Sequence, residues 1–215
     1  MPLSEPVARE RLHTRTIVIE GFRRADGLFD VEARLTDTKS YGFSNEDRGW
    51  IAPGEPLHGM LMRLTIDSDM RVVACEANTE FAPYAICPAI TPNFAALAGL
   101  RIGPGWMRAV RERVGGVKGC THLVELLGPM ATVAFQTLVV LRRQAPADDA
   151  RPPALLNTCH AYAADSPVVA RRWPRFAQSV RAAAERGEAA AGEVLEGSAD
   201  EDPRDVRAAA PDASG

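Results

Sequence analysis

The sequence lacks the short motifs that identify the best-known metal, thiol and nucleotide proteins. It has no Cys-x-x-Cys pair, which disfavours zinc-ribbon and thioredoxin-like folds, and no His-Glu-x-x-His, the helical motif of zinc proteases. It also has no Gly-x-Ser-x-Gly to place a serine nucleophile, and no glycine-rich phosphate loop after a predicted strand. No single motif therefore identifies an activity.

An excess of positive charge is also missing. The chain has 25 Lys and Arg residues against 28 Asp and Glu residues, a net charge of −3, which disfavours a nucleic-acid partner. Its first residues, M-P-L-S-E, lack the pattern of a signal peptide, and polar or helix-breaking residues interrupt the longest apolar stretch, 123–141. We expect a cytoplasmic protein with reduced cysteines and no membrane partner, for which a small-molecule substrate and homo-oligomers remain open.

Length and composition predict one sizeable domain. The chain has 215 residues, of which 46% are hydrophobic and 25% charged, as is ordinary for a globular protein. We expect a flexible lead-in over 1–12, a single α+β domain over 13–177, and a largely disordered tail over 178–215. The tail is rich in Ala, Glu, Asp and Arg and has few apolar residues.

The first part of the domain is predicted to be an antiparallel sheet. A β-prone segment, 16–20, and an alternating segment, 28–35, flank the turn signal Asp26-Gly27. The segments 59–66 and 70–79 flank a second turn. The pattern predicts two hairpins with about four strands, separated by a loop over residues 37–56.

Three helices are predicted after the sheet, over 91–100, 106–114 and 120–143. Thr91-Pro92 is typical of the start of a helix, and Gly115-Gly116 ends the second helix. Strands followed by helices indicate an α+β fold with the helices packed on one face of the sheet.

Cys120 and His122 give the strongest chemical signal. Cys120 lies at the predicted start of the third helix, where the helix dipole lowers a thiol pKa and favours the thiolate that binds metals or attacks carbon and sulfur. Helical residues two apart point about 200° away from each other. The two side chains therefore converge only if Cys120 still lies in the preceding loop; otherwise Cys120 is a buried thiol and His122 a surface residue.

Four further residues extend the set of candidate ligands. Cys87 lies at the strand-to-helix junction, and His58 lies where the loop enters the second hairpin. Cys159 and His160 are neighbours in a polar loop, where functional residues often occur. For each, the alternative is an ordinary structural or surface role.

A polar cluster follows the first hairpin. It contains Asp37, Lys39 and Tyr41, and Lys39 and Tyr41 could act as an acid or a charge partner near a thiolate; the alternative is an exposed loop. Cys75 is predicted to be structural because it lies within a strand, and His13 is predicted to be solvated in the lead-in.

Several short motifs resemble a bacterial domain family with no established activity, over about residues 13–176. These motifs are H-T-R, D-G-L-F-D-V-E-A, D-T-K-S-Y, P-L-H-G-M, L-T-I-D, A-P-Y-A-I-C, G-C-T-H-L and N-T-C-H-A-Y.

The order of elements resembles the U-type iron–sulfur cluster scaffold, in which three cysteines bind the cluster. The resemblance places His58 at the position of the first cysteine, Cys87 at the second and Cys120 at the third, and Met60 replaces an aspartate of that family. It implies a zinc or iron site made by His58, Cys87 and Cys120. A fourth ligand would come from His122, Cys159 or His160.

These observations leave three functions open. The first is a small metalloenzyme, a hydrolase or lyase acting on a small organic substrate through a His/Cys/Cys-ligated metal. The second is an iron–sulfur or zinc carrier, or a sulfur acceptor, related to the scaffold family. The third is a non-enzymatic small-molecule-binding domain with buried, inert cysteines.

Overall fold

A computed structural model describes residues 3–144, 152–153 and 155–178 of the chain. The chain divides into two compact units, Met1–Pro146 and Ala147–Gly215, and each is described by itself. The tail predicted over 178–215 lies, except for its first residue, outside the described part.

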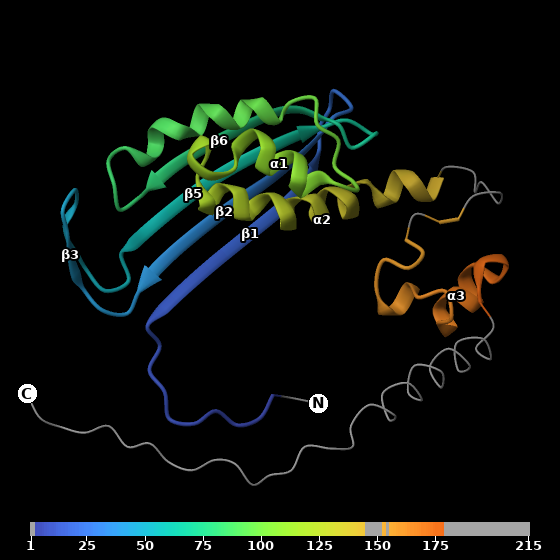
Figure 1. The fold of residues 1–215 in the computed structure, drawn as a ribbon, viewed down its shortest axis with the longest axis horizontal. Helices are drawn as coiled ribbons and strands as arrows, with labels where there is room; N and C mark the ends of the chain where they lie inside the picture. The colour runs from blue at the N-terminus through green and yellow to red at the C-terminus, as the bar shows by residue number, and fades with distance from the viewer. Residues whose placement is uncertain (1–2, 145–151, 154, 179–215) are drawn as a thin grey trace, which may run out of the picture. The chain divides into compact units, whose positions relative to one another are not determined.

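The first unit contains a four-stranded antiparallel sheet followed by helices, which confirms the predicted α+β class (Figure 1). The strands lie in the order β1-β2-β5-β6, so each neighbours the next along the sheet. Their bounds are β1, His13–Arg23; β2, Phe29–Lys39; β5, Pro56–Ile66; and β6, Val72–Phe81. Each strand continues past at least one end of its predicted segment, although β2 and β6 begin one and two residues later than predicted.

Alternation along the strands creates one apolar face. On β2 the buried side chains are those of Phe29, Val31, Ala33 and Leu35, and on β5 they are those of Met60, Met62, Leu64 and Ile66. Because successive side chains of a strand point to opposite faces, these rows define the face on which the helices pack. In the first turn, Gly27 has a φ of 87°, which a residue without a side chain adopts readily.

A second, small sheet occupies the segment predicted to be a loop. It consists of β3, Phe43–Asn45, and β4, Gly49–Ile51. The Asn45 side-chain oxygen accepts hydrogen bonds from the backbone N–H groups of Asp47 and Arg48, which closes the turn. Strands of three residues are too short for alternation to reveal, so the loop prediction for 37–56 was wrong in this part.

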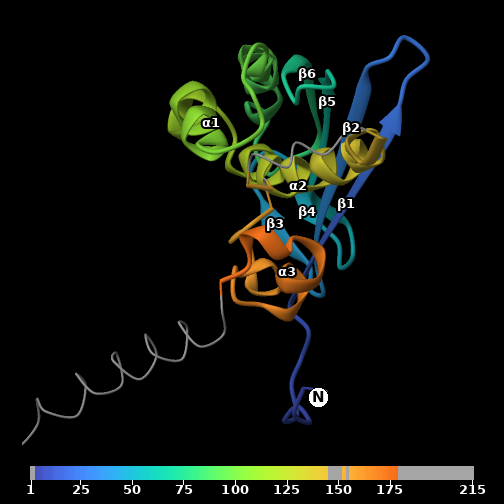
Figure 2. The same ribbon diagram turned by 90° about the vertical axis from the view of Figure 1, so that its right-hand side faces the viewer.

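The helices lie on the apolar face of the sheet (Figures 1 and 2). They are η1, a 3₁₀ helix over Cys87–Leu97; α1, Trp106–Val114; η2, a 3₁₀ turn over Gly116–Lys118; and α2, Thr121–Gln144. The prediction for 106–114 is confirmed, and α2 begins one residue after its predicted start. The first helix begins earlier than predicted: the Thr91 hydroxyl donates to the Pro88 carbonyl within η1 instead of marking its N-terminus.

Helix α2 packs on the sheet and contributes a row of buried side chains to the core. Its fully buried residues lie against β1, β2 and β5: Leu123, Leu126, Leu127, Met130 and Ala134. The indole N–H of Trp106 donates to the Leu127 carbonyl at 2.9 Å, which ties α1 to α2. By length and composition alone, residues 121–139 could also cross a membrane, a test that the core helix of a globular domain passes equally.

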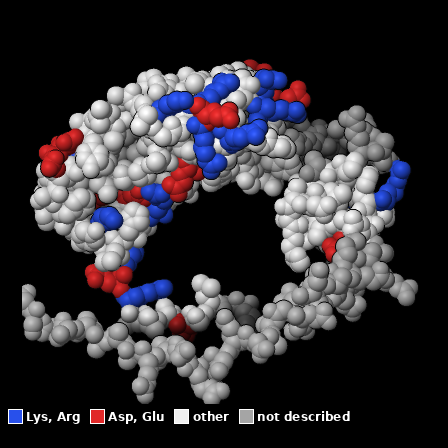
Figure 3. Space-filling view, in the orientation of Figure 1, with Lys and Arg blue, Asp and Glu red and all other residues white. Residues whose placement is uncertain are grey.

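Charged side chains of both signs gather over α1 (Figure 3). Several of the cations bind the free carbonyls at helix ends. Arg113 donates to the carbonyl of Ala98, and Lys118 donates to the carbonyl of Glu112. Such contacts satisfy backbone acceptors that the helix itself leaves unpaired.

The second unit has short elements only among its described residues. These are η3, His160–Tyr162; α3, Pro167–Arg172; and η4, Pro174–Phe176. The Ser166 hydroxyl caps α3 by accepting from the N–H of Val169 at 3.1 Å. The rings of Tyr162 and Trp173 pack with centroids 5.4 Å apart.

Candidate metal centre

A buried carboxylate ends the apolar row of β2. The inward positions of this strand are apolar up to Leu35, and the next one is Asp37, which is only 1% exposed. A buried charge is costly unless other groups pair with it and hydrogen-bond to it. The partners of Asp37 therefore define the site.

Arg15 supplies the first partner from the neighbouring strand. Arg15, Asp37 and His58 lie directly opposite one another on β1, β2 and β5. The Arg15 Nε donates to Asp37 Oδ1 at 2.8 Å and its Nη2 donates to Oδ2 at 2.7 Å, a bidentate pair. Arg15 Nη1 also pairs with Glu125 of α2, so one guanidinium connects the sheet to the helix.

Asp37 is ionised in this setting. Burial by itself raises the pKa of its carboxyl group, but the hydrogen bonds and charge of Arg15, together with the contact to His58, outweigh burial and lower the pKa below its ordinary value. The hydrogen bonds to Asp37, with the charges of Asp37 and Glu125, raise the pKa of Arg15. The pair is therefore charged on both sides at neutral pH.

His58 contacts the other side of the carboxylate. Its Nδ1 lies 2.9 Å from Asp37 Oδ2, and its side chain is 15% exposed. Burial, followed by the charge of His122, lowers the pKa of His58, although Asp37 acts in the opposite direction. A lowered pKa keeps the imidazole neutral near pH 7, and the neutral form is the one that binds metals.

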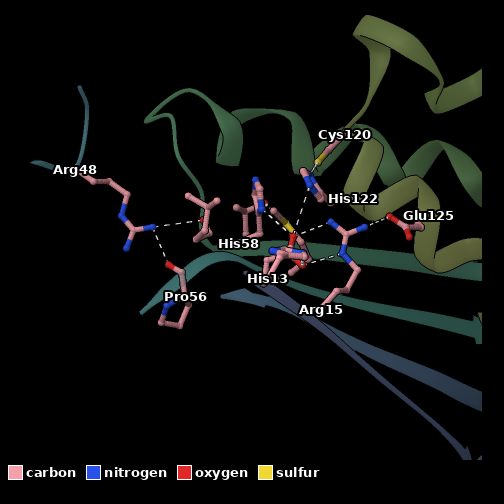
Figure 4. Close-up of polar contacts among 12 residues, drawn as sticks. His13, Arg15, Arg48, Pro56, His58, Cys120, His122 and Glu125 are labelled. Carbon is pink, nitrogen blue, oxygen red and sulfur yellow. Dashed lines mark hydrogen bonds and ion pairs between the residues drawn. The ribbon is translucent and has the colours of Figure 1, made fainter. Parts of the chain in front are cut away.

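His122 approaches from the first turn of α2. Its Nε2 lies 3.9 Å from Asp37 Oδ2, and its ring packs on that of His58 with centroids 3.8 Å apart (Figure 4). Its other nitrogen, Nδ1, lies 3.8 Å from Cys120 Sγ. Cys120 precedes α2, as convergence with His122 requires. Burial raises the pKa of Cys120, but the contact with His122 and the backbone N–H groups of Leu123 and His122 lower it overall.

His13 lies at the solvent side of the cluster. It is the first residue of β1, its Nε2 lies 3.4 Å from Asp37 Oδ1, and its side chain is 40% exposed. The sequence contains four histidines, and three of them converge on one carboxylate. His13 is exposed to solvent, as predicted, but it belongs to β1 and not to the lead-in, and it contacts Asp37.

Asp37, His58 and His122 form a group that could hold a metal ion. One ligand atom from each lies within 4.8 Å of the others. In a tetrahedral site with bonds of about 2.0–2.2 Å, ligand atoms are about 3.3–3.6 Å apart. The separations of 2.9 and 3.9 Å from Asp37 Oδ2 lie on either side of that range. Two imidazoles and a carboxylate are a donor set that catalytic zinc and non-haem iron use.

The cysteine ligands predicted from the sequence are not part of this group. Among the residues that the structure describes, no set of three or more potential ligands includes a cysteine, so Cys87 and Cys120 lie outside the candidate group and no cysteine cluster supports an iron–sulfur centre. Cys120 faces Nδ1 of His122, whereas Nε2 faces Asp37. Cys87 begins η1 and has no place in the ligand group.

The other candidate residues are not members of the ligand group. Lys39 Nζ lies 5.9 Å from the ring centroid of Tyr41, which is 46% exposed, and their catalytic roles stay predictions. His160 belongs to η3 of the second unit, where Cys159 is exposed, so its role as a ligand also stays a prediction. Cys75 is buried, and burial raises the pKa of its thiol to about 12.

Sequence reasoning identified His58 and His122 and missed the residues that organise them. Asp37 was noted only as part of a polar cluster, and Arg15 was not noted as a site residue. A signal for Asp37 was present, because extending the alternation of 28–35 by two residues places it on the buried face. Arg15 and His13 could be found only from the pairing of β1 with β2.

Comparison with known proteins gives one match. No curated protein and no solved structure matches the chain, so the resemblance to U-type scaffolds has no structural support. A family model matches residues 13–136, more than half of the chain, and this range contains every residue of the cluster around Asp37. The chain therefore belongs to the family described as "Protein of unknown function (DUF2889)".

Proposed function

We propose that Asp37, His58 and His122 bind a divalent transition-metal ion, zinc or iron, and that the protein is a metal-dependent enzyme acting on a small organic substrate. The observation that carries the proposal is the convergence of three ligand atoms within 4.8 Å from two strands and a helix. Packing alone does not explain the buried carboxylate of Asp37 among three imidazoles, because apolar residues fill the preceding inward positions of β2.

The surrounding residues suit this role. Arg15 holds both oxygens of Asp37 and is itself held by Glu125, so the carboxylate has one fixed orientation. Cys120 contacts Nδ1 of His122 and leaves Nε2 directed to Asp37. Partners of this kind orient metal ligands and select the tautomer of a histidine.

Three protein ligands leave coordination positions open. A divalent metal held in this way supplies a Lewis acid that polarises a carbonyl group or lowers the pKa of bound water. This chemistry supports a hydrolase or a lyase. Because burial lowers the pKa of His58, its imidazole is neutral near pH 7 and is ready to bind without first releasing a proton.

Metal binding by the intact chain tests the proposal. Protein purified without chelator is analysed for zinc and iron, treated with EDTA, and titrated with Zn²⁺ by calorimetry. We expect about one equivalent of high-affinity binding, lost in His58→Gln and His122→Gln and retained in the control Cys87→Ser, which removes a thiol outside the group. Absence of binding to the wild-type chain, or equal binding by all four proteins, would refute the metal site.

A second function is favoured by one geometric feature. Cys120 Sγ, His122 and Asp37 lie in series, with Sγ 3.8 Å from Nδ1 and Nε2 3.9 Å from Oδ2. This is the order of nucleophile, base and orienting acid in thiol enzymes. The variant Cys120→Ala distinguishes the two functions. If the protein is a metalloenzyme, this variant still binds the metal. If it is a thiol enzyme, the protein binds no metal and this variant loses all activity.

A further inference from the structure

We propose that the outer edge of β1 pairs with β1 of a second copy of this chain, so that two four-stranded sheets join into one antiparallel sheet of a homodimer. Strand β1 lies at one edge of the sheet and has β2 on one side only (Figures 1 and 2). Among the described residues, no backbone group of β1 bonds to a segment on its outer side. The inference concerns a surface and does not depend on the proposed metal site.

The two edges of the sheet differ in how they are protected. At the β6 edge, the N–H of Val72 donates to Leu100 and its carbonyl accepts from Gly99, each at 2.8 Å, and η1 packs against the strand. At the β1 edge, eleven residues pair with β2 without a bulge and include neither proline nor lysine, which commonly protect edge strands. The inward-pointing Arg15 is already paired with Asp37. A long, regular edge of this kind is a template for another strand.

The backbone of β1 presents alternate residues to its outer edge. The Leu12 carbonyl accepts from the N–H of Ser40, and the N–H of Arg24 donates to the Leu28 carbonyl, so even-numbered residues here bond to β2. The odd-numbered residues therefore direct their N–H and carbonyl groups to the outer edge: His13, Arg15, Ile17, Ile19, Gly21 and Arg23. An antiparallel copy of the same strand would pair with all of them.

The side chains of β1 complement one another in one antiparallel register. With Val18 on the two-fold axis, it faces Val18 of the second copy on the outer face of the sheet, where it is 50% exposed. On the inner face, the half-buried Ile17 faces Ile19 of the second copy, which extends the apolar core across the junction. The Thr16 hydroxyl faces the carboxylate of Glu20. Apolar and polar pairs of this kind stabilise neighbouring strands.

Charge favours this register over the neighbouring ones. It places Arg15 opposite Gly21, and His13 meets Arg23 only at the two exposed ends of the paired strands. A shift by two residues is the smallest that keeps each side chain on its face of the sheet. It would place Arg15 opposite Arg23 in one direction and Arg11 opposite Arg23 in the other. Like charges directly opposite each other destabilise a strand pair.

The oligomeric state of the full-length chain tests the proposal. Light scattering after size-exclusion chromatography, and sedimentation over a range of concentrations, give the mass of the wild-type chain, Val18→Lys and Val73→Lys. Val18→Lys places two ammonium groups opposite each other on the two-fold axis. The control changes a valine of β6 that is 47% exposed, close to the 50% of Val18. Neither variant removes a buried residue.

We expect the wild-type chain and Val73→Lys to have twice the 23.2 kDa mass of one chain. The dissociation constant of Val18→Lys should be at least about 10-fold higher. A dimer that Val18→Lys leaves unchanged would refute the interface. A wild-type chain that is monomeric at every concentration would refute the homodimer and leave the edge to a different partner.

Disulfide cross-linking tests the register itself. Opposite residues that do not exchange hydrogen bonds have Cα atoms about 4.5 Å apart, within the range that a disulfide spans. Under mild oxidation, Val18→Cys should therefore form a covalent dimer and Val73→Cys should not, with the exposed Cys159 replaced by serine in both proteins. Equal cross-linking of the two variants would overturn the proposed pairing of β1 with its copy.

Discussion

Replacing Asp37 by alanine should destabilise the metal-free protein even though it removes only a few atoms. The substitution leaves the Arg15 guanidinium with Glu125 as its remaining acidic partner and removes the acceptor for His58 Nδ1. The protein loses stability because Arg15 and His58 stay in place while the carboxylate that accepts their hydrogen bonds is removed. Asp37→Asn keeps the shape and one acceptor oxygen and should cost less than Asp37→Ala.

The expected magnitude follows from the burial of the pair. Removing one partner of a buried ion pair costs about 3–5 kcal/mol. The Asp37 side chain is 1% exposed, but that of Arg15 is 28% exposed and keeps its contact with Glu125. We therefore expect a loss of about 2–3 kcal/mol in the free energy of unfolding. With a urea m-value of about 2 kcal/mol/M, the unfolding midpoint should fall by about 1–1.5 M.

A double-mutant cycle measures the pair itself. Urea unfolding of the EDTA-treated wild-type protein, Asp37→Ala, Arg15→Ala and the double variant gives the coupling energy between the two side chains. We expect a coupling of about 1–3 kcal/mol, because Arg15 contributes little once its main acceptor is gone. A coupling below about 0.5 kcal/mol would show that the bidentate contact does not stabilise the fold, and the reasoning would be refuted.

Three further predictions test other features of the structure. Because burial and His122 lower the pKa of His58, the unfolded chain takes up a proton that the folded chain does not as pH falls through about 6.5. The unfolding free energy of the metal-free protein should decline over that range, less so in His58→Gln, and equal pH slopes would contradict the assignment. Iodoacetamide should modify Cys120 faster than Cys75, because burial raises the pKa of Cys75 to about 12, and peptide mass spectrometry follows both rates. Similar rates would contradict the burial of Cys75. An added methyl group at Gly21 would overlap Thr137 Oγ1, so Gly21→Ala should cost about 1–3 kcal/mol in urea unfolding. Thr137→Ala should recover most of that loss, and failure to do so would place the strain elsewhere.

The sheet and helices could be predicted because their signals are local. Alternation over 28–35 and the turn at Asp26-Gly27 predict β2 and its hairpin from neighbouring residues alone. Pro104-Gly105 and Gly115 mark the two ends of the helix over 106–114 in the same way. The short strands β3 and β4 escaped prediction because three residues carry too little pattern.

The site could not be predicted because it depends on register. His13, Asp37, His58 and His122 are brought together only when β1, β2 and β5 pair with the observed register and α2 docks across them. A shift of one residue in any pairing of the strands would turn one of these side chains to the other face of the sheet. The resemblance to a three-cysteine scaffold ranked the thiols first, although Cys120 instead contacts His122 at the nitrogen that faces away from Asp37.

The stability of the fold does not explain why these polar residues form a cluster around Asp37, and their chemical types favour a function. Apolar residues of similar volume often replace a buried ion pair with little loss, or with a gain, in stability. Leu35 shows that this face of β2 accepts a large apolar side chain one step before Asp37. A chain that required only a folded domain could therefore continue the apolar row. It instead places a carboxylate there, fixes it with Arg15 and surrounds it with three imidazoles. Departures of this kind from the local pattern are expected at functional sites, and the side chains involved are those that bind transition metals.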